Sequence, residues 1–253
     1  MQYLFTAEGE EALRGLPRGT LLAFDYDGTL APIVPLPTQA HAPPEILQLL
    51  RLLAMRAPVA IVSGRGVADL IERVPDNVPF IVGNHGNEGL GDEPRHAADA
   101  HALMAEWTAQ LRELLGPHPE REGLLLENKG ISMSVHYRLA GDPDKMQRTL
   151  PARLQRLDPA PVIIGGKLVF NLLPPGSRTK YEAIVEVAAR CQAPTVLFVG
   201  DDVTDEYVFE RAPASWLTLR VESSPASRAR YFVRQQDEVA RVLAMLVEQT
   251  GTA

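Results

Sequence analysis

Short apolar runs and longer amphipathic stretches follow one another along the chain. The short β-branched or apolar runs predict buried strands, and apolar residues three or four positions apart predict helices. Before residue 89 the expected order is strand 21–24, proline-rich loop 31–44, helix 45–55, strand 58–62, helix 67–73 and strand 80–82. Strand and helix in alternation predict a parallel sheet with helices on both faces.

The middle of the chain has a different order of elements. We expect a helix over 98–115, paired strands over 124–127 and 131–138, a helix over 142–157 bent or broken near Pro151, and a hairpin of 162–164 and 168–172 around Gly165 and Gly166. This αββαββ order needs no parallel crossover, so we interpret it as a separate α+β insert.

After the insert the strand–helix alternation resumes. The expected elements are helix 180–190, strand 196–199, helix 206–211, strands 216–221 and 231–233, and a last helix from 237. We therefore predict an α/β protein: a Rossmann-like parallel-sheet core of residues 1–88 and 174–253, and an inserted α+β cap domain of residues 89–173. Ligands in such sheets bind at the carboxyl ends of strands, where Asp25, Ser63 and Asn84 stand.

Composition and charge limit the classes of partner. The chain has 253 residues, 45% hydrophobic and 23% charged, which is typical of a globular protein. A net charge of −7 argues against nucleic acid as a partner. Cys191 is the only cysteine, so an internal disulfide is excluded. No apolar run approaches the roughly 18 residues of a membrane span, and the first residues do not resemble a secretory signal. We therefore expect a soluble, cytoplasmic protein without a membrane partner.

The most informative stretch is Asp25-Tyr26-Asp27-Gly28-Thr29-Leu30, which directly follows the first predicted strand. In a continuing strand the two carboxylates would share a face. Two close like charges are costly unless a cation or a proton lies between them. An Asp-Gly turn at an ordinary strand end is the alternative, but the whole string behind a buried strand favours a paired-acid metal site.

Three further motifs carry candidate chemistry. Ser63-Gly64-Arg65 offers a hydroxyl and a close backbone to a phosphate, with a simple turn as the alternative. The stretch 200–206 holds four carboxylates, and a helix N-terminus would account for Asp205 and Glu206 better than for the pair before them. Lys180 begins a predicted helix against its dipole, which a bound anion would explain; a solvated lysine is the alternative.

The string from Asp25 to Leu30 resembles the first motif of the haloacid dehalogenase (HAD) superfamily, most of whose members are phosphatases. The resemblance implies that Asp25 is the nucleophile that accepts the phosphoryl group. It also implies that Asp27 is the general acid and base and that its backbone carbonyl binds Mg²⁺. Dehalogenase members lack the second Asp, so Asp27 favours phosphoryl transfer.

The remaining motifs resemble the other HAD motifs in the expected order. The resemblance implies that Ser63, with Gly64 and Arg65, binds phosphate, and that Lys180 balances the charge of nucleophile and phosphate, with Arg178 its nearest competitor. The string 200–206 has the GDDxTDE form of sugar phosphatases. By this resemblance Asp201 is a metal ligand, Asp202 orients metal-bound water or supports the site, and the role of Asp205 stays open.

Within the insert the resemblance narrows to trehalose-6-phosphate phosphatases. The segment from Glu127 to Arg138 resembles their E-x-K-G…H-Y-R segment, and residues 83–86 resemble their N-H-G loop. Four polar residues also alternate along one predicted strand, and this face suits a ligand with many hydroxyls, although exposure to solvent is the alternative for each. The substrate-binding residues that the resemblance implies are Asn84, His85, Glu127, Lys129, His136 and Arg138.

The resemblance implies a Mg²⁺-dependent phosphatase of trehalose biosynthesis that hydrolyses trehalose 6-phosphate through an aspartyl-phosphate. The implied partners are a small-molecule sugar phosphate and, functionally, a sugar-phosphate synthase. One stretch departs from the family pattern: Asn171 or Leu172 holds the position of a sugar-contacting Glu, and Tyr181 replaces a Gly. This departure keeps two alternatives open, a phosphatase for another ester, such as a glycosyl-phosphoglycerate or sucrose phosphate, and a non-catalytic sugar-phosphate sensor.

Overall fold

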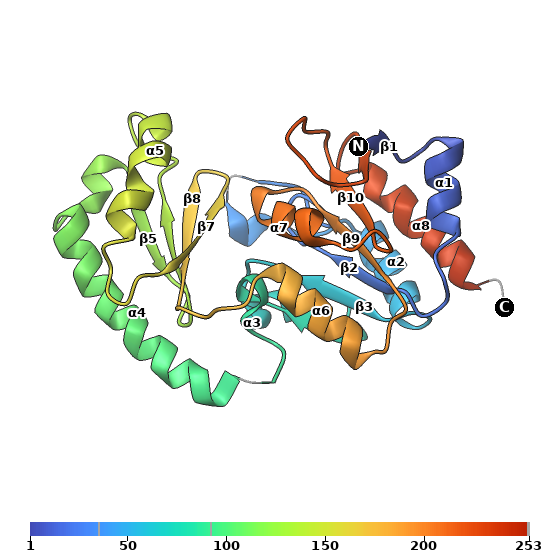
Figure 1. The fold of residues 1–253 in the computed structure, drawn as a ribbon, viewed down its shortest axis with the longest axis horizontal. Helices are drawn as coiled ribbons and strands as arrows, with labels where there is room; N and C mark the ends of the chain where they lie inside the picture. The colour runs from blue at the N-terminus through green and yellow to red at the C-terminus, as the bar shows by residue number, and fades with distance from the viewer. Residues whose placement is uncertain (35, 92, 252–253) are drawn as a thin grey trace. The chain divides into compact units, whose positions relative to one another are not determined.

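Two compact units make up the chain, which is drawn as a ribbon in Figure 1. The computed structural model describes residues 1–34, 36–91 and 93–251, with side chains except at 37 and 93–98. Unit 1 consists of Met1–Gly89 and Arg178–Ala253, and unit 2 of Leu90–Ser177. The boundaries predicted from the sequence lie between residues 88 and 89 and between residues 173 and 174. They precede the two points at which the chain passes between the units by one residue and by four residues.

In unit 1 the described residues form a parallel sheet in the order β1-β11-β10-β9-β2-β3-β4. Its strands are β1 (Gln2–Tyr3), β2 (Leu21–Phe24), β3 (Val59–Val62), β4 (Phe80–Val82), β9 (Val196–Gly200), β10 (Leu217–Val221) and β11 (Tyr231–Val233). The predicted parallel sheet is thus confirmed. β2 pairs with β3 on one side and with β9 on the other, which brings their carboxyl ends together.

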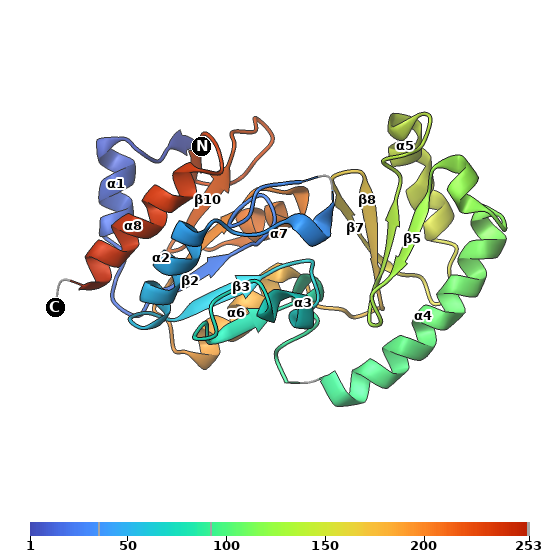
Figure 2. The same cartoon turned by 180° about the vertical axis from the view of Figure 1, so that it is seen from behind.

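Helices cover both faces of this sheet, as a parallel sheet requires. They are α1 (Ala7–Arg14), α2 (Pro44–Ala54), α3 (Val67–Ile71), α6 (Lys180–Arg190), α7 (Val203–Arg211) and α8 (Glu238–Gly251). α6 and α7 lie toward the viewer in Figure 1, and α2 and α8 in the reverse view of Figure 2. Apolar side chains of α2 and α8, among them Leu50 and Val242, pack with Phe24 and Val199 in one buried core.

Unit 2 has its own sheet and its own core. Its antiparallel sheet has the order β5-β6-β8-β7, formed by β5 (Leu125–Asn128), β6 (Met133–His136), β7 (Val162–Gly166) and β8 (Val169–Leu173). Helices α4 (Glu93–Leu115) and α5 (Pro143–Leu154) complete the predicted αββαββ order. Trp107 of α4 is fully buried with Leu150 of α5 and with Val135 and Phe170 of the sheet.

The structure differs from the sequence prediction mainly at element ends. β1 and α1 are additional elements, and Thr6 caps the start of α1, because its side chain accepts a hydrogen bond from the Gly9 N–H. α5 was expected to bend or break near Pro151, but its hydrogen-bonded helix runs through this residue to Leu154. Pro151 has no N–H and so removes one backbone hydrogen bond, and the helix ends three residues later. Among the described helices, none is both long and apolar enough to cross a membrane.

One side chain joins the two places where the chain leaves and re-enters unit 1. The Asn87 amide donates to the Arg178 carbonyl at 2.9 Å and accepts from the Arg178 N–H at 2.8 Å. Both residues belong to unit 1 and stand beside the two crossings. We call this pair of hydrogen bonds the Asn87–Arg178 clasp.

Candidate active site

The carboxyl ends of neighbouring strands in unit 1 gather the polar motifs. Asp25 follows β2, Ser63 follows β3, Asn84 lies just beyond β4, and Asp201 follows β9. The Asp25 N–H donates to the Val199 carbonyl, which continues the pairing of β2 with β9 up to the first carboxylate. The sheet edge expected from the sequence is therefore the one on which these residues stand.

Lys180 joins two acidic motifs in the interior of unit 1. It is the first residue of α6, and its Nζ lies 2.9 Å from Oδ1 of Asp25 and 2.7 Å from Oδ1 of Asp205. The Lys180 side chain is 3% exposed and that of Asp205 is fully buried. A buried charge is stable only when it is paired and hydrogen-bonded. The buried ion pairs thus explain why this lysine stands at a helix N-terminus.

Asp205 also shapes the loop after β9. Its second carboxylate oxygen accepts hydrogen bonds from the backbone N–H groups of Asp201 and Asp202 at 2.9 and 3.0 Å. Asp202 is the N-cap of α7 and forms a capping box with Asp205. The sequence left the role of Asp205 open; the structure places it between the loop, the helix cap and Lys180.

Three carboxylates could hold a metal ion. Ligand atoms of Asp25, Asp201 and Asp205 lie within 4.8 Å of one another. Oδ1 of Asp201 is buried and has no hydrogen-bond partner among the described residues, as expected of an oxygen that binds a cation. A Cβ at Gly28, where φ is +81°, would stand 2.1 Å from the other Asp201 oxygen, so only glycine leaves room for this carboxylate. Carboxylate oxygens are the ligands that hard divalent cations prefer.

Burial sets the protonation of these acids when no metal is bound. Burial raises the pKa of Asp25 to about 7, although Lys180 opposes the shift. Burial, with the charge of Asp25, raises the pKa of Asp201 to about 9. The pKa of Asp202 is raised, again chiefly by burial. Burial alone would lower the pKa of Lys180, but the charges of Asp205 and Asp25 raise it above its usual value. The site holds more negative charge than Lys180 can balance, which favours a cation.

Asp27 has an environment quite unlike that of Asp25. Its side chain is 39% exposed, against 6% for Asp25, and Arg65 holds both of its oxygens. Nε and Nη2 of Arg65 donate to Asp27 Oδ2 and Oδ1 at 2.6 and 2.7 Å, and Nη1 donates to Asp69 at 2.7 Å. Two close carboxylates in such unequal surroundings are suited to unequal chemical roles.

The loop after β4 packs against the motif after β3. The Asn84 N–H donates to the Arg65 carbonyl, and the His85 N–H donates to the Ser63 carbonyl. Asn84 and His85 both have positive φ, at 47° and 57°. A Cβ at Gly64 would approach the His85 ring to 2.6 Å. The structure thus brings together Ser63, Gly64, Arg65, Asn84 and His85, which the sequence had placed in two separate motifs.

The other expected substrate residues belong to unit 2. Glu127, Ser134 and Asn171 stand opposite one another on adjacent strands and therefore share a face of the sheet. His136 Nε2 lies 2.9 Å from a Glu127 carboxylate oxygen, and the Ser134 hydroxyl donates to the Asn171 side-chain oxygen at 2.7 Å. Leu172 points into the core of unit 2, so of the two residues at the departing position Asn171 lies on the polar face. Lys129 follows β5 and Arg138 is exposed beyond β6.

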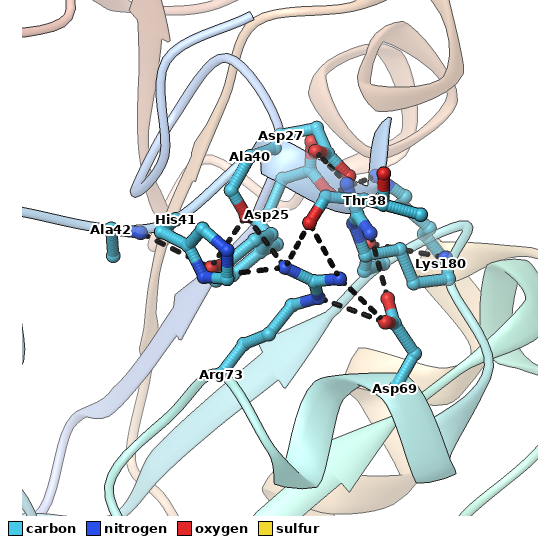
Figure 3. A network of polar contacts seen from close by, with 12 residues as sticks. Asp25, Asp27, Thr38, Ala40, His41, Ala42, Asp69, Arg73 and Lys180 are labelled. Carbon is cyan, nitrogen blue, oxygen red and sulfur yellow. Dashed lines mark hydrogen bonds and ion pairs between the residues drawn. The ribbon is translucent and has the colours of Figure 1, made fainter. Parts of the chain in front are cut away.

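Two charged residues beside the site were not among those predicted from the sequence. Asp69 and Arg73 extend the contacts of Asp27 and Arg65, and Figure 3 shows Arg73 between Asp69 and the backbone carbonyls of Thr38 and Ala40. Arg65, Asp69 and Arg73 are spaced four residues apart, the spacing of helical ion pairs. This spacing was visible in the sequence and could have identified them.

Comparison with known proteins agrees with this geometry. The chain matches the model of the trehalose-phosphatase family over residues 23–237. It is 34% identical over 197 residues to the trehalose-phosphate phosphatase of Mycobacterium bovis (strain BCG / Pasteur 1173P2), covering 74% of this chain and 50% of the relative. For the Mycolicibacterium paratuberculosis protein of the same name the identity is 30% over 248 residues, covering 94% and 60%. The chain thus spans about half to three fifths of these curated relatives.

Solved structures show the same fold. A structure of Aspergillus fumigatus trehalose-6-phosphate phosphatase is similar with 26% identity and a TM-score of 0.63, over 98% of this chain and 99% of that one. The C-terminal domain of the Candida albicans (C. albicans) enzyme has 21% identity and a TM-score of 0.74, over 94% and 95%, and supports the fold alone. Fold and site together define an α/β protein of the HAD superfamily. Within that superfamily, the chain belongs to the trehalose-phosphatase family.

Proposed function

We propose that this protein is a Mg²⁺-dependent phosphatase that hydrolyses trehalose 6-phosphate through an aspartyl-phosphate. The observation that carries the proposal is the buried group of Asp25, Lys180, Asp201 and Asp205 at the carboxyl edge of the sheet. It combines a nucleophile, a fixed cation and a set of metal ligands. Family membership and the names of the relatives support the substrate.

In the proposed reaction, a carboxylate oxygen of Asp25 forms a bond to phosphorus. The bond between phosphorus and the sugar oxygen breaks, its electron pair stays on that oxygen, and Asp27 supplies the proton. Asp27 then takes a proton from the water that cleaves the aspartyl-phosphate, so one difficult displacement becomes two easier steps. Lys180 offsets the negative charge of nucleophile and phosphate, and Ser63 with Gly64 binds phosphate oxygens.

Asp25, the backbone carbonyl of Asp27 and Asp201 would hold the metal, and the unpartnered oxygen of Asp201 supports this assignment. When bound, Mg²⁺ lessens the repulsion between the carboxylate nucleophile and the phosphate. Both oxygens of Asp205 already accept hydrogen bonds, and Asp202 caps α7. We therefore assign Asp205 mainly to supporting the site, and a contact of Asp202 with the metal stays a prediction.

We assign choice of the sugar to unit 2, through Glu127, Lys129, His136 and Arg138. The more exposed Glu127–His136 pair and the buried Ser134–Asn171 pair lie on one face of the sheet, and polar groups of this kind suit a polyhydroxyl ligand. We also propose that Asn84 and His85, in unit 1, bind substrate. Asn171 at the departing position favours a second candidate, a phosphatase for a different sugar ester, because an amide recognises hydroxyls differently from a carboxylate.

A phosphate-release assay tests the proposal. With Mg²⁺ we expect rapid release from trehalose 6-phosphate, slower release from sucrose 6-phosphate and a glycosyl-phosphoglycerate, and none in excess chelator. The variant Asp25→Asn should lose turnover while keeping its unfolding midpoint. Clear activity on another ester but not on trehalose 6-phosphate would refute the substrate and keep the mechanism. Substantial activity of Asp25→Asn would refute the nucleophile.

A cytoplasmic location and a functional link to a sugar-phosphate synthase complete the proposal. The single cysteine, which forms no intramolecular disulfide, supports a reducing compartment. Cell fractionation, and trehalose 6-phosphate levels in a strain without the gene, test these two statements.

A further inference from the structure

The contact between Arg65 and Asp27 is a two-point contact along one edge of a carboxylate. Nε of Arg65 donates to one oxygen and Nη2 donates to the other, at 2.6 and 2.7 Å. Two parallel hydrogen bonds fix both the plane and the direction of a carboxylate. A carboxylate has about four lone-pair sites, so the edge away from Arg65 stays available for a proton.

Arg65 is itself held by a chain of charged contacts. Its Nη1 donates to Asp69, and Asp69 accepts two hydrogen bonds from Arg73. Arg73 also donates to the Ala40 carbonyl at 2.9 Å. The exposed fractions of the Arg65 and Arg73 side chains are only 11% and 8%. This chain ties the loop after β2 to α3 and leaves the Arg65 fork little freedom to turn.

The loop that carries Asp27 is held from a second direction. The fully buried Tyr26 hydroxyl donates to the Ala40 carbonyl at 3.3 Å and accepts from the Ala42 N–H at 3.2 Å. The Arg65 guanidinium lies 5.5 Å from the centre of the Tyr26 ring. The backbone and the side chain of the Asp27 loop are therefore both fixed.

We infer that Arg65 is a positioning residue for Asp27 rather than a phosphate ligand, an inference that rests on the proposed function. Arg65 and Arg73 face Asp27 and Asp69, so the four charges sum to zero and leave little attraction for an anion. All three guanidinium nitrogens of Arg65 already donate to carboxylates. Since Asp27 is 39% exposed, burial alone does not hold its carboxylate in one orientation.

The leaving group of the substrate distinguishes the positioning of Asp27 by Arg65 from a purely structural role of Arg65. When the sugar–phosphate bond breaks, the alkoxide must receive a proton, and Asp27 gives it. A nitrophenolate leaves without a proton at neutral pH. Poor placement of Asp27 should therefore slow hydrolysis of an alkyl phosphate and spare p-nitrophenyl phosphate. The kcat/KM value is the right measure, because it covers the steps up to departure of the leaving group.

The experiment compares kcat/KM of the Mg²⁺-loaded protein for p-nitrophenyl phosphate and for the best sugar phosphate of the substrate panel. We expect Arg65→Ala and Asp69→Asn to lose at least ~10-fold more on the sugar phosphate than on p-nitrophenyl phosphate, since acid catalysis contributes ~10²- to 10⁴-fold. Arg65→Lys should behave like Arg65→Ala, because lysine lacks the fork. Arg51→Ala, which removes a surface ion pair of unit 1, is the matched control.

Equal losses on both substrates, with weaker inhibition by inorganic phosphate, would overturn the inference and make Arg65 a phosphate ligand. The variant Asp27→Asn distinguishes failure of the proposed function from failure of the positioning role of Arg65. If Asp27→Asn itself shows no dependence on the leaving group, the proposed function fails. If it shows the dependence and Arg65→Ala and Asp69→Asn do not, only the inference fails.

The kcat/KM value of a double variant at Asp27 and Arg65 gives a result that a purely structural role of Arg65 would not reproduce. When Arg65 acts only through Asp27, Arg65→Ala in the Asp27→Asn background should leave kcat/KM on the sugar phosphate within ~2-fold of Asp27→Asn alone. Multiplied losses would mean that Arg65 acts on the substrate directly. Should Arg65→Ala fail to fold, Asp69→Asn and Arg65→Lys carry the same comparison.

Discussion

At the scale of single residues, the protein keeps a lysine where water cannot reach it. Lys180 offsets part of the charge of Asp25 and Asp205, and these carboxylates in turn keep the lysine charged. A buried ion pair adds little net stability, but removal of one partner leaves an uncompensated charge. Under the proposed function, stability and chemistry therefore depend on the same side chain.

We expect Lys180→Met to destabilise unit 1 by about 3 kcal/mol and to abolish turnover, because the buried carboxylates of Asp25 and Asp205 lose their cation. Urea unfolding at neutral pH measures the first effect and phosphate release the second. Arg190→Met in the same helix removes an exposed ion pair with Glu186 and should change the stability by about 0.5 kcal/mol or less. Equal effects of the two variants would contradict the buried pairing.

The acidic group also predicts how stability depends on pH. The pKa values of Asp25 and Asp201 are raised to about 7 and about 9, against about 3.9 in an unfolded chain. Between these values the folded protein binds more protons than the unfolded one, so stability falls as pH rises. In chelator, the urea midpoint should therefore decrease from pH 5 to pH 9.

Mg²⁺ should reverse this decrease, and it should stabilise the protein most at the alkaline end, where the ligands are deprotonated without cost. Asp201→Asn removes one of the acids with a raised pKa, so its metal-free stability should depend less on pH. A wild-type midpoint that is independent of pH in chelator would show that these acids are not shifted.

At the scale of elements, each site motif lies where a strand passes into a loop or a helix begins. The loop after β9 turns into α7 at Asp202, which makes a capping box with Asp205. This cap explains why α7 begins at Val203, three residues before the start that the apolar pattern predicted. A helix start is set by its cap, and the periodicity of apolar residues does not include the cap.

Asp202 therefore allows a test between capping and metal binding. As a cap, Asp202→Ser should keep stability and Mg²⁺ affinity, while Asp202→Ala should cost about 1 kcal/mol of stability. Urea unfolding and Mg²⁺ titration of turnover give the two quantities. Loss of Mg²⁺ affinity in the serine variant would instead assign Asp202 to the metal.

The positions of the elements that consist of buried apolar runs could be predicted from the sequence. β2, β3 and β9 are buried at every position, and the expected strands agree with them to within one residue. The short β1, with two residues, has no such pattern. The separate motifs were visible, but the pairing of Arg65 with Asp27, 38 residues away, follows from the order of the strands and not from a local pattern.

At the scale of the whole molecule, each of the two units has its own hydrophobic core. Each unit holds one of the two tryptophans: Trp216 lies in unit 1 beside Tyr181, and Trp107 lies in unit 2. Trp107 is fully buried and its indole N–H donates to the Pro159 carbonyl at 3.0 Å. The fluorescence of each tryptophan therefore reports on one unit.

We expect the two units to unfold in separate transitions, since each has its own core. Trp216→Phe leaves a signal from unit 2 only, and Trp107→Phe leaves a signal from unit 1 only. Urea midpoints of the two variants, each checked against far-UV circular dichroism, should differ. Coincident midpoints in both variants would mean that the units unfold as one cooperative body.

The Asn87–Arg178 clasp bears on how such a chain can change over evolutionary time. Because the Asn87 side chain is hydrogen-bonded to the Arg178 backbone, the two segments of unit 1 that flank the insertion are held side by side. An insertion with adjoining ends can be lengthened, exchanged or shortened to a few residues without pulling the parent sheet apart. Selection can thus replace the inserted module as a whole while the parallel-sheet unit stays unchanged, and protein engineers can do the same.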